Sequence, residues 1–149
     1  MVVNPGGPDL ADEYEISSDP ARFDRETFHH WISDLSYWAN GRARETTEAA
    51  CDASVVFGAY LGTGEMIGCA RVVTDGLTFA WLCDVFVDEP YRSRGVGRRL
   101  MEAVMEHPGM AEMKRFVLAT ADAHGLYEEV GFETLKKPER WMIRSGSVV

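Results

Sequence analysis

Apolar side chains recur at helical spacing in the stretch that follows Asp19-Pro20. The residues at positions i, i+3, i+4 and i+7 are Phe28, Trp31, Ile32 and Leu35. They would share one face of an α-helix. Aspartate before proline often begins a helix, and Asn40-Gly41 often ends one. The pattern therefore predicts a helix of about 20 residues, followed by a second, shorter helix over residues 44–53.

From residue 54 onward, the helical spacing of apolar residues is replaced by runs of residues that favour β-strands. Runs over residues 54–61, 66–74 and 77–87 are separated by glycine-containing turns, which predicts an antiparallel meander. A helix with Val96, Leu100, Met101 and Val104 on one face then ends near Pro108-Gly109. Together with a short first strand over residues 14–17, these elements indicate an α+β fold.

The last third of the chain predicts shorter elements. We expect a strand over residues 116–121, a helix capped by Asp122 and closed by Gly131, and two final strands over residues 132–135 and 140–144. The whole order predicts a mixed, mostly antiparallel central sheet that is flanked by helices.

Length and composition bound the organisation of the chain. Its 149 residues suit one domain, which we place at residues 12–149 behind a mobile tail over residues 1–11. The three cysteines are odd in number and lie in apolar stretches, so we expect buried thiols rather than disulfides or a metal site. Without a signal-peptide pattern or an apolar run near 18 residues, we expect a cytoplasmic protein with no membrane partner.

Charge is unevenly distributed along the chain. The net charge is −9, which argues against nucleic acid as a partner. Residues 92–99, in contrast, carry four arginines and no acid. One basic patch on an acidic chain favours a small polyanionic ligand. The acidic remainder suits either a cationic partner or a solvated surface.

The basic patch belongs to a strand, turn and helix with a recognisable pattern. After the strand that ends at Val87, the turn residues are Arg92, Ser93, Arg94, Gly95, Val96, Gly97 and Arg98. Glycines allow positive φ and close approach of the backbone to a ligand. The N–H groups of the turn and of the helix's first turn can then converge on phosphate, assisted by the helix dipole and by the arginines, Arg99 included. The segment predicts a pyrophosphate site.

Two other interpretations of this turn are possible from its glycines. A dinucleotide-binding fold requires G-x-G-x-x-G and an acidic residue after the next strand, whereas this chain has two glycines and Ala-Thr-Ala. A glycine turn of structural importance alone is the other alternative. The pattern R-x-x-G-x-G after V-x-V resembles motif A of the GCN5-related N-acetyltransferases, the GNAT family, which holds the pyrophosphate of acetyl-CoA.

A second match supports the same resemblance. The segment from Ala123 to Phe132 contains A-x-x-L-Y and then G-F, which resembles motif B of the family. The resemblance implies a GNAT-like three-layer fold, acetyl-CoA as acyl donor and no metal. It also implies that backbone groups of Val85, Phe86 and Val87 hold the pantetheine arm. Thr120 departs from the asparagine that many members carry seven residues before the tyrosine.

The resemblance assigns catalytic roles to two residues. Tyr127 is expected to protonate the leaving sulfur, since a phenol with pKa near ~10 stays protonated at neutral pH; the alternative is a packing tyrosine. Asp84 lies on an apolar strand, aligned by alternation with Leu82 and Phe86. It is expected to draw the proton from the amine, directly or through water, unless it is a structural acid. His124 is an alternative base.

These features lead to a functional hypothesis. The chain transfers acetyl from acetyl-CoA to a primary amine of a small molecule or a protein, by direct attack in a ternary complex. Tyr37, Trp38 and Trp81 either wall the acceptor pocket or belong to the core. The alternative function is a non-catalytic CoA-binding regulatory module. The acceptor's identity is left open, and so is a homodimer.

Overall fold

The computed structural model describes residues 13–146, so the tail expected at residues 1–11 lies outside the described residues. Five strands form one sheet in the order β1-β2-β3-β4-β5. The strands are β1 (Tyr14–Ser17), β2 (Val55–Leu61), β3 (Met66–Thr74), β4 (Ala80–Val87) and β5 (Phe116–Val117). The first four pair antiparallel and β5 pairs parallel to β4. This confirms the predicted meander and the mixed sheet.

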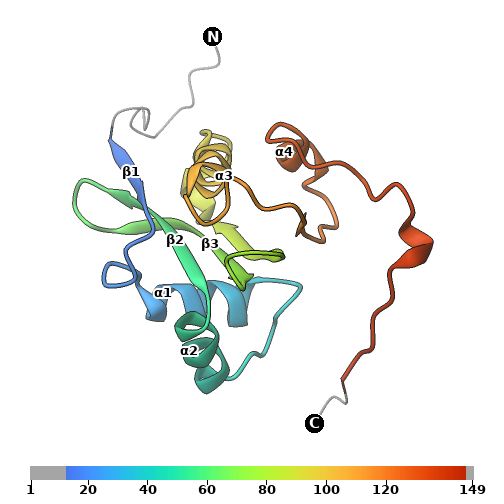
Figure 1. Ribbon diagram of the computed structural model, residues 1–149. Helices are drawn as coiled ribbons and strands as arrows, with labels where there is room; N and C mark the ends of the chain where they lie inside the picture. The colour runs from blue at the N-terminus through green and yellow to red at the C-terminus, as the bar shows by residue number, and fades with distance from the viewer. Residues whose placement is uncertain (1–12, 147–149) are drawn as a thin grey trace.

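Helices cover both faces of the sheet (Figure 1). On one face lie α1 (Arg25–His30), the π-helical η1 (Trp31–Leu35) and α2 (Arg44–Asp52), and on the other lie α3 (Val96–Glu106) and α4 (His124–Glu128). Each face has its own core. Val56 and Tyr60 of β2 pack toward α1 and η1, whereas Phe57 and Ala59 pack toward α3. The three-layer α+β architecture is therefore confirmed.

Strand β4 does not keep one alternation along its length. Cys69 pairs with Phe86 and Arg71 pairs with Cys83, so Asp84 and Val85 together face Ala70. Asp84 has φ 49°, as expected for a β-bulge. Leu82 consequently packs in the core beside α3, and Phe86 packs in the core beside α1. The expectation that Leu82 and Phe86 share a face is wrong, because the extra residue of the bulge moves the side chains that follow it to the opposite face of the sheet.

The first helix is shorter than predicted. Residues 19–23 form a turn in which Asp19 accepts the Ala21 N–H at 2.9 Å, and Asp24 caps α1 by accepting the Thr27 N–H at 3.0 Å. The π-helical η1 then changes the residue spacing. As a result Leu35 is 55% exposed and does not share the buried face. The chain returns through Gly41, at φ 82°, whose N–H donates to the Ser33 carbonyl.

Three elements in the second half differ from expectation. The strand expected over residues 116–121 pairs only at Phe116 and Val117. The cap expected from Asp122 is absent, because the Ala123 N–H donates to the Thr120 hydroxyl at 3.0 Å and α4 begins at His124. Gly131, at φ 97°, does close the helix, with its N–H on the Glu128 carbonyl.

The prediction of two final strands is wrong, since residues 132–135 and 140–144 pair with no strand among the described residues. The 3-10 helix η3 (Pro138–Arg140) follows the first segment and includes Arg140 of the second. Met142 and Ile143 are 97% and 90% exposed, so the segment lacks the packing that stabilises a strand. No described helix has both the length and the apolar character needed to span a membrane.

Candidate active site

The glycine turn between β4 and α3 has the backbone of an anion site. Gly95 caps α3 at φ 82° and Ser93 has φ 61°, both in the left-handed region. The first helical hydrogen bond runs from the Arg99 N–H to the Gly95 carbonyl at 3.0 Å. The N–H groups of the first turn, from Val96 to Arg98, are thereby left for another acceptor. Such a helix start can bind pyrophosphate.

The arginines around the turn have different surroundings. Arg92 donates from Nε to the Val87 carbonyl at 2.8 Å, and its guanidinium lies 5.0 Å from the centre of the Phe86 ring. It therefore joins the turn to the end of β4. Arg98 pairs with Glu102 at 3.1 Å and with Glu129 at 3.7 Å. Arg99 lies over the ring of Tyr14 on β1, at 4.6 Å.

A cavity opens where β4 and β5 separate. The two strands pair at Ala80 with Phe116 and at Trp81 with Val117. Beyond Trp81, no described strand pairs with this edge of β4. A cavity of about 550 Å³ lies between residues 82–85 and residues 118–123. Backbone groups of β4, including Val85, are therefore available to a ligand that takes the place of a strand.

Tyr127 of α4 lines this cavity. It also lines a second cavity of about 500 Å³ with His124 and Phe132. Its side chain is 8% exposed, and its ring packs edge-on against Phe132 at 6.0 Å. Burial, with smaller contributions from Tyr37 and Asp122, raises the pKa of Tyr127 to about 12. The phenol thus holds its proton at any pH near neutral.

Asp84 of β4 lines the same cavity, and both oxygens of its carboxylate accept hydrogen bonds. Oδ1 accepts from the Trp38 indole at 2.8 Å, and Oδ2 accepts from Arg42 Nη1 at 2.8 Å and Arg71 Nε at 2.9 Å. Burial alone would raise the pKa of Asp84, but these hydrogen bonds outweigh it and the pKa is lowered. A carboxylate held in this way is a weak base, which favours the structural alternative for Asp84.

The loop between η1 and α2 supplies one wall of the cavity. Tyr37 and Trp38 contact each other edge to face at 5.0 Å and are 64% and 42% exposed. The Tyr37 hydroxyl accepts the Ala121 N–H at 3.2 Å, which ties this loop to the segment after β5. Trp81, 37% exposed, lines the same cavity. These three aromatics wall the pocket and are not core residues.

Arg42 and Arg71 are the site residues that sequence reasoning missed. One lies in the connection before α2 and the other on β3, and only the fold brings them to Asp84. The one available signal was Arg71 itself. A charged residue within an apolar strand requires a buried partner, and Asp84 was the acid on the neighbouring strand.

Three of the four histidines form hydrogen bonds with nearby groups. His29 Nδ1 lies 2.7 Å from the Thr47 hydroxyl, His30 Nδ1 lies 2.7 Å from Asp34, and His107 Nδ1 accepts the Gly109 N–H. His124 lines the cavity beside Phe132. Within residues 13–146, no group of three or more His, Cys, Asp or Glu side chains is arranged to hold a metal ion.

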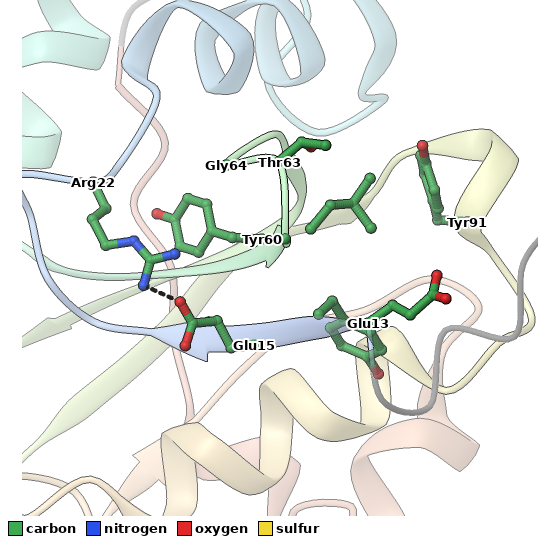
Figure 2. Close-up of a pocket in the computed structure, with 10 residues that line it drawn as sticks. Glu13, Glu15, Arg22, Tyr60, Thr63, Gly64 and Tyr91 are labelled. Atoms are coloured by element: carbon green, nitrogen blue, oxygen red, sulfur yellow. Dashed lines mark ion pairs between the residues drawn. The ribbon is translucent and has the colours of Figure 1, made fainter.

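A further cavity of about 650 Å³ lies beside β1 and the β2–β3 turn. Figure 2 shows Arg22 paired with Glu15 across it and lying beside the Tyr60 ring, with Tyr91 at the other end. It contains none of the predicted catalytic or coenzyme-binding residues. The candidate site is therefore the cavity at Tyr127 together with the glycine turn.

Residues 15–132 match the acetyltransferase (GNAT) family. A candidate acetyltransferase of Gibberella zeae, FG08082, is 28% identical over 134 residues, which cover 77% of this chain and 76% of that protein.

Solved structures show the same fold. A crystal structure of a GNAT-family protein from Xanthomonas campestris has a TM-score of 0.85 and 38% identity, covering 89% of this chain and 93% of that one. A GNAT-family acetyltransferase from Elizabethkingia anophelis, solved with acetyl-CoA bound, has a TM-score of 0.61 and 19% identity, covering 82% of this chain and 77% of that one. The second likeness concerns the fold alone.

Proposed function

Because this chain belongs to the acetyltransferase (GNAT) family, we propose that it transfers the acetyl group of acetyl-CoA to a primary amine of a small molecule or a protein. The family's match includes both the glycine turn and Tyr127. The main support for the proposal is the position of Tyr127. It lines a cavity beside the edge of β4 that pairs with no described strand beyond Trp81, and β4 leads directly into the glycine turn.

We place acetyl-CoA along this edge. Its pyrophosphate binds the N–H groups of residues 95–98, within the turn that Arg92, Ser93 and Arg94 complete. Its pantetheine arm pairs with backbone groups of Val85, Phe86 and Val87, and the thioester reaches Tyr127. Holding both reactants in one orientation lowers the barrier by up to ~7–11 kcal/mol, so positioning is the chief contribution of the site.

In the proposed reaction, the neutral amine attacks the thioester carbonyl and forms the C–N bond. The C–S bond then breaks and its electron pair stays on sulfur. The Tyr127 hydroxyl donates to this sulfur. A phenol of pKa about 12 is a weaker acid than a thiol with pKa near ~8.5, so the phenol does not stay deprotonated after it donates to sulfur. The proton that the attacking nitrogen releases must therefore return to the Tyr127 oxygen as transfer proceeds.

The amine must lose one proton before attack. The sequence assigns this step to Asp84, either directly or through water, with His124 as the alternative. The three side chains that donate to Asp84 leave it poorly suited to direct proton abstraction. We therefore favour water in the cavity as the immediate acceptor, with Asp84 positioning Trp38 and Arg42.

Release of CoA thiol from acetyl-CoA tests the function. We expect release that depends on both the protein and an added primary amine, together with acetylated amine detected by mass spectrometry. Binding of acetyl-CoA without release over a broad set of amines would instead support the non-catalytic CoA-binding module.

A further inference from the structure

Two arginines that line the cavity share one buried carboxylate. The side chains of Arg42, Arg71 and Asp84 are 18%, 12% and 1% exposed. Among the described residues, Asp84 is the only carboxylate bonded to either guanidinium. The cluster therefore carries one positive charge in excess, largely withdrawn from water.

An uncompensated charge in such a place is costly unless an anion joins it. The two arginines differ in their capacity to take one. Arg71 donates Nε to Asp84 and Nη1 to the Ser54 hydroxyl, both at 2.9 Å. Arg42 binds Asp84 through Nη1 at 2.8 Å and more weakly through Nη2 at 3.4 Å. Each guanidinium uses two of its five N–H donors in these bonds. Arg42 is the more exposed of the two, and its remaining donors are therefore the more accessible to a carboxylate.

The same cavity is also lined by a residue of the opposite charge. Asp122 lines the cavity near Tyr127, and it is close enough to contribute, after burial and Tyr37, to the raised pKa of that phenol. A ligand with an anionic end at Arg42 and an amine end near Tyr127 would match both. The exposed rings of Tyr37, Trp38 and Trp81 line the same cavity. Aromatic walls of this kind bind flat apolar groups.

From this arrangement we infer that the acceptor is a small amino-carboxylate with an aromatic side chain, whose carboxylate binds Arg42 and whose amine faces the thioester beside Tyr127. This inference rests on the proposed function and narrows its acceptor. A lysine side chain within a protein carries no carboxylate near its amine, and so leaves Arg42 without its partner. Asp84 is a positioning residue here, since it holds Trp38 and Arg42 in place.

Phenylalanine and 2-phenylethylamine test the inference, because they share the ring and amine and differ by the carboxylate. We expect the parent protein to prefer phenylalanine in kcat/KM by roughly 10-fold or more, the range of a charge-assisted hydrogen bond. Arg42→Met should bring this ratio to about one, while Arg42→Lys should retain part of it. Arg44→Met is the matched control, since Arg44 pairs with Glu48 on α2 outside the cavity, and it should keep the parent ratio.

Calorimetric binding of both compounds to the CoA-saturated protein separates this inference from the proposed function. Preference for phenylalanine that depends on Arg42, without acetyl transfer, would support the inference and overturn the function. Transfer to a lysine peptide or to phenylethylamine at least as fast as to phenylalanine would support the function and overturn the inference. An absence of both binding and transfer with phenylalanine and tryptophan would also overturn the inference. If Arg42→Met fails to fold, the ratio of kcat/KM for phenylalanine to that for 2-phenylethylamine is measured in Arg42→Lys instead. A ratio equal to that of the parent would overturn the assignment of the carboxylate to Arg42.

Discussion

Gly97 of α3 lies directly against Leu126 of α4. A Cβ placed on Gly97 would stand 3.5 Å from Leu126 Cδ2 and 3.9 Å from Val87 Cγ2, which are ordinary packing distances. The turn that we assign to pyrophosphate and the helix that carries Tyr127 are therefore in contact at a residue without a side chain. A methyl group fits there, whereas a longer side chain has to displace Leu126 or enter the turn.

Gly97→Glu should abolish coenzyme binding. In the parent, acetyl-CoA at ~100 times its Kd is expected to stabilise the fold by ~2.7 kcal/mol, measured as a rise in Tm. The glutamate places bulk and negative charge beside the phosphates, so the rise should vanish. Gly97→Ala is the matched control and should retain most of it. A folded glutamate variant with the parent's rise in Tm would remove the coenzyme from this turn.

Tyr127→Phe should slow chemistry while leaving the fold intact. The ring contact with Phe132 survives, but the hydroxyl that donates to sulfur is lost. We expect kcat to fall by roughly 10²-fold or more, within the range for general acids, with Tm and acetyl-CoA affinity near the parent values. An unchanged kcat, under conditions where chemistry limits turnover, would leave Tyr127 as a packing residue.

Tyr60→Phe is the control for that variant and a prediction in its own right. Tyr60 is 1% exposed, and its hydroxyl has no hydrogen-bond partner among the described residues. Its removal takes away a buried polar group that nothing compensates, so chemical denaturation should show an increase of about 1 kcal/mol in stability. Activity should stay at the parent level. A loss of stability would indicate that the hydroxyl has a partner.

Asp84→Asn distinguishes a catalytic base from a structural acid. The structural role predicts a loss of about 3–5 kcal/mol of stability, because two buried guanidiniums lose their counter-charge. The base role predicts a kcat lower by ~10²–10⁴-fold with stability retained. Since the folded pKa of Asp84 is lowered from 3.8, its contribution is present above pH about 4 and is lost as pH falls through the folded pKa. Acid denaturation of the parent and the variant should differ accordingly.

The alkaline side of the pH dependence follows from Tyr127. Burial first, then Tyr37 and Asp122, raise its pKa to about 12, so the proton donor is intact at pH 9. The kcat should not decline between pH 8 and 10 through this group. Because the folded pKa lies above the unfolded value, stability is full below pH about 10 and falls as pH rises toward 12. Ultraviolet titration of phenolate should show one late-titrating tyrosine fewer in Tyr127→Phe.

Local patterns predicted the elements whose determinants are local. The meander, α2, α3 and the glycine turn follow from alternation, helical spacing and turn residues, and they lie close to where these signals placed them. The first helix failed because a π-helical turn moved Leu35 off the buried face. The final strands failed because β propensity at residues 132–135 and 140–144 does not by itself provide a partner strand.

The site residues also divide into those with a local signal in the sequence and those that only the fold brings together. Tyr127 could be singled out, since its surroundings in the sequence are distinctive and the fold places it in the cavity. The partners of Asp84 could not, because Trp38 and Arg42 lie 46 and 42 positions away along the chain. The orientation of the Asp84 side chain could not be predicted either, because the bulge depends on a register between β3 and β4 that the sequence does not display.

That bulge also determines which changes of length the protein can tolerate. Deleting Val85 would restore simple alternation and leave Leu82 on the α3 side and Phe86 on the α1 side, because residues three apart on a regular strand face opposite sides. Asp84 would then face the same side as Ala70, and Arg42 and Arg71 would lose their carboxylate. The turn at residues 75–79 lies outside this constraint, because its hydrogen bonds are made by Asp75 within the turn itself. Changes of length should therefore be accepted at residues 75–79, whereas the deletion of Val85 should keep the strand packed and remove the ion pairs of Asp84.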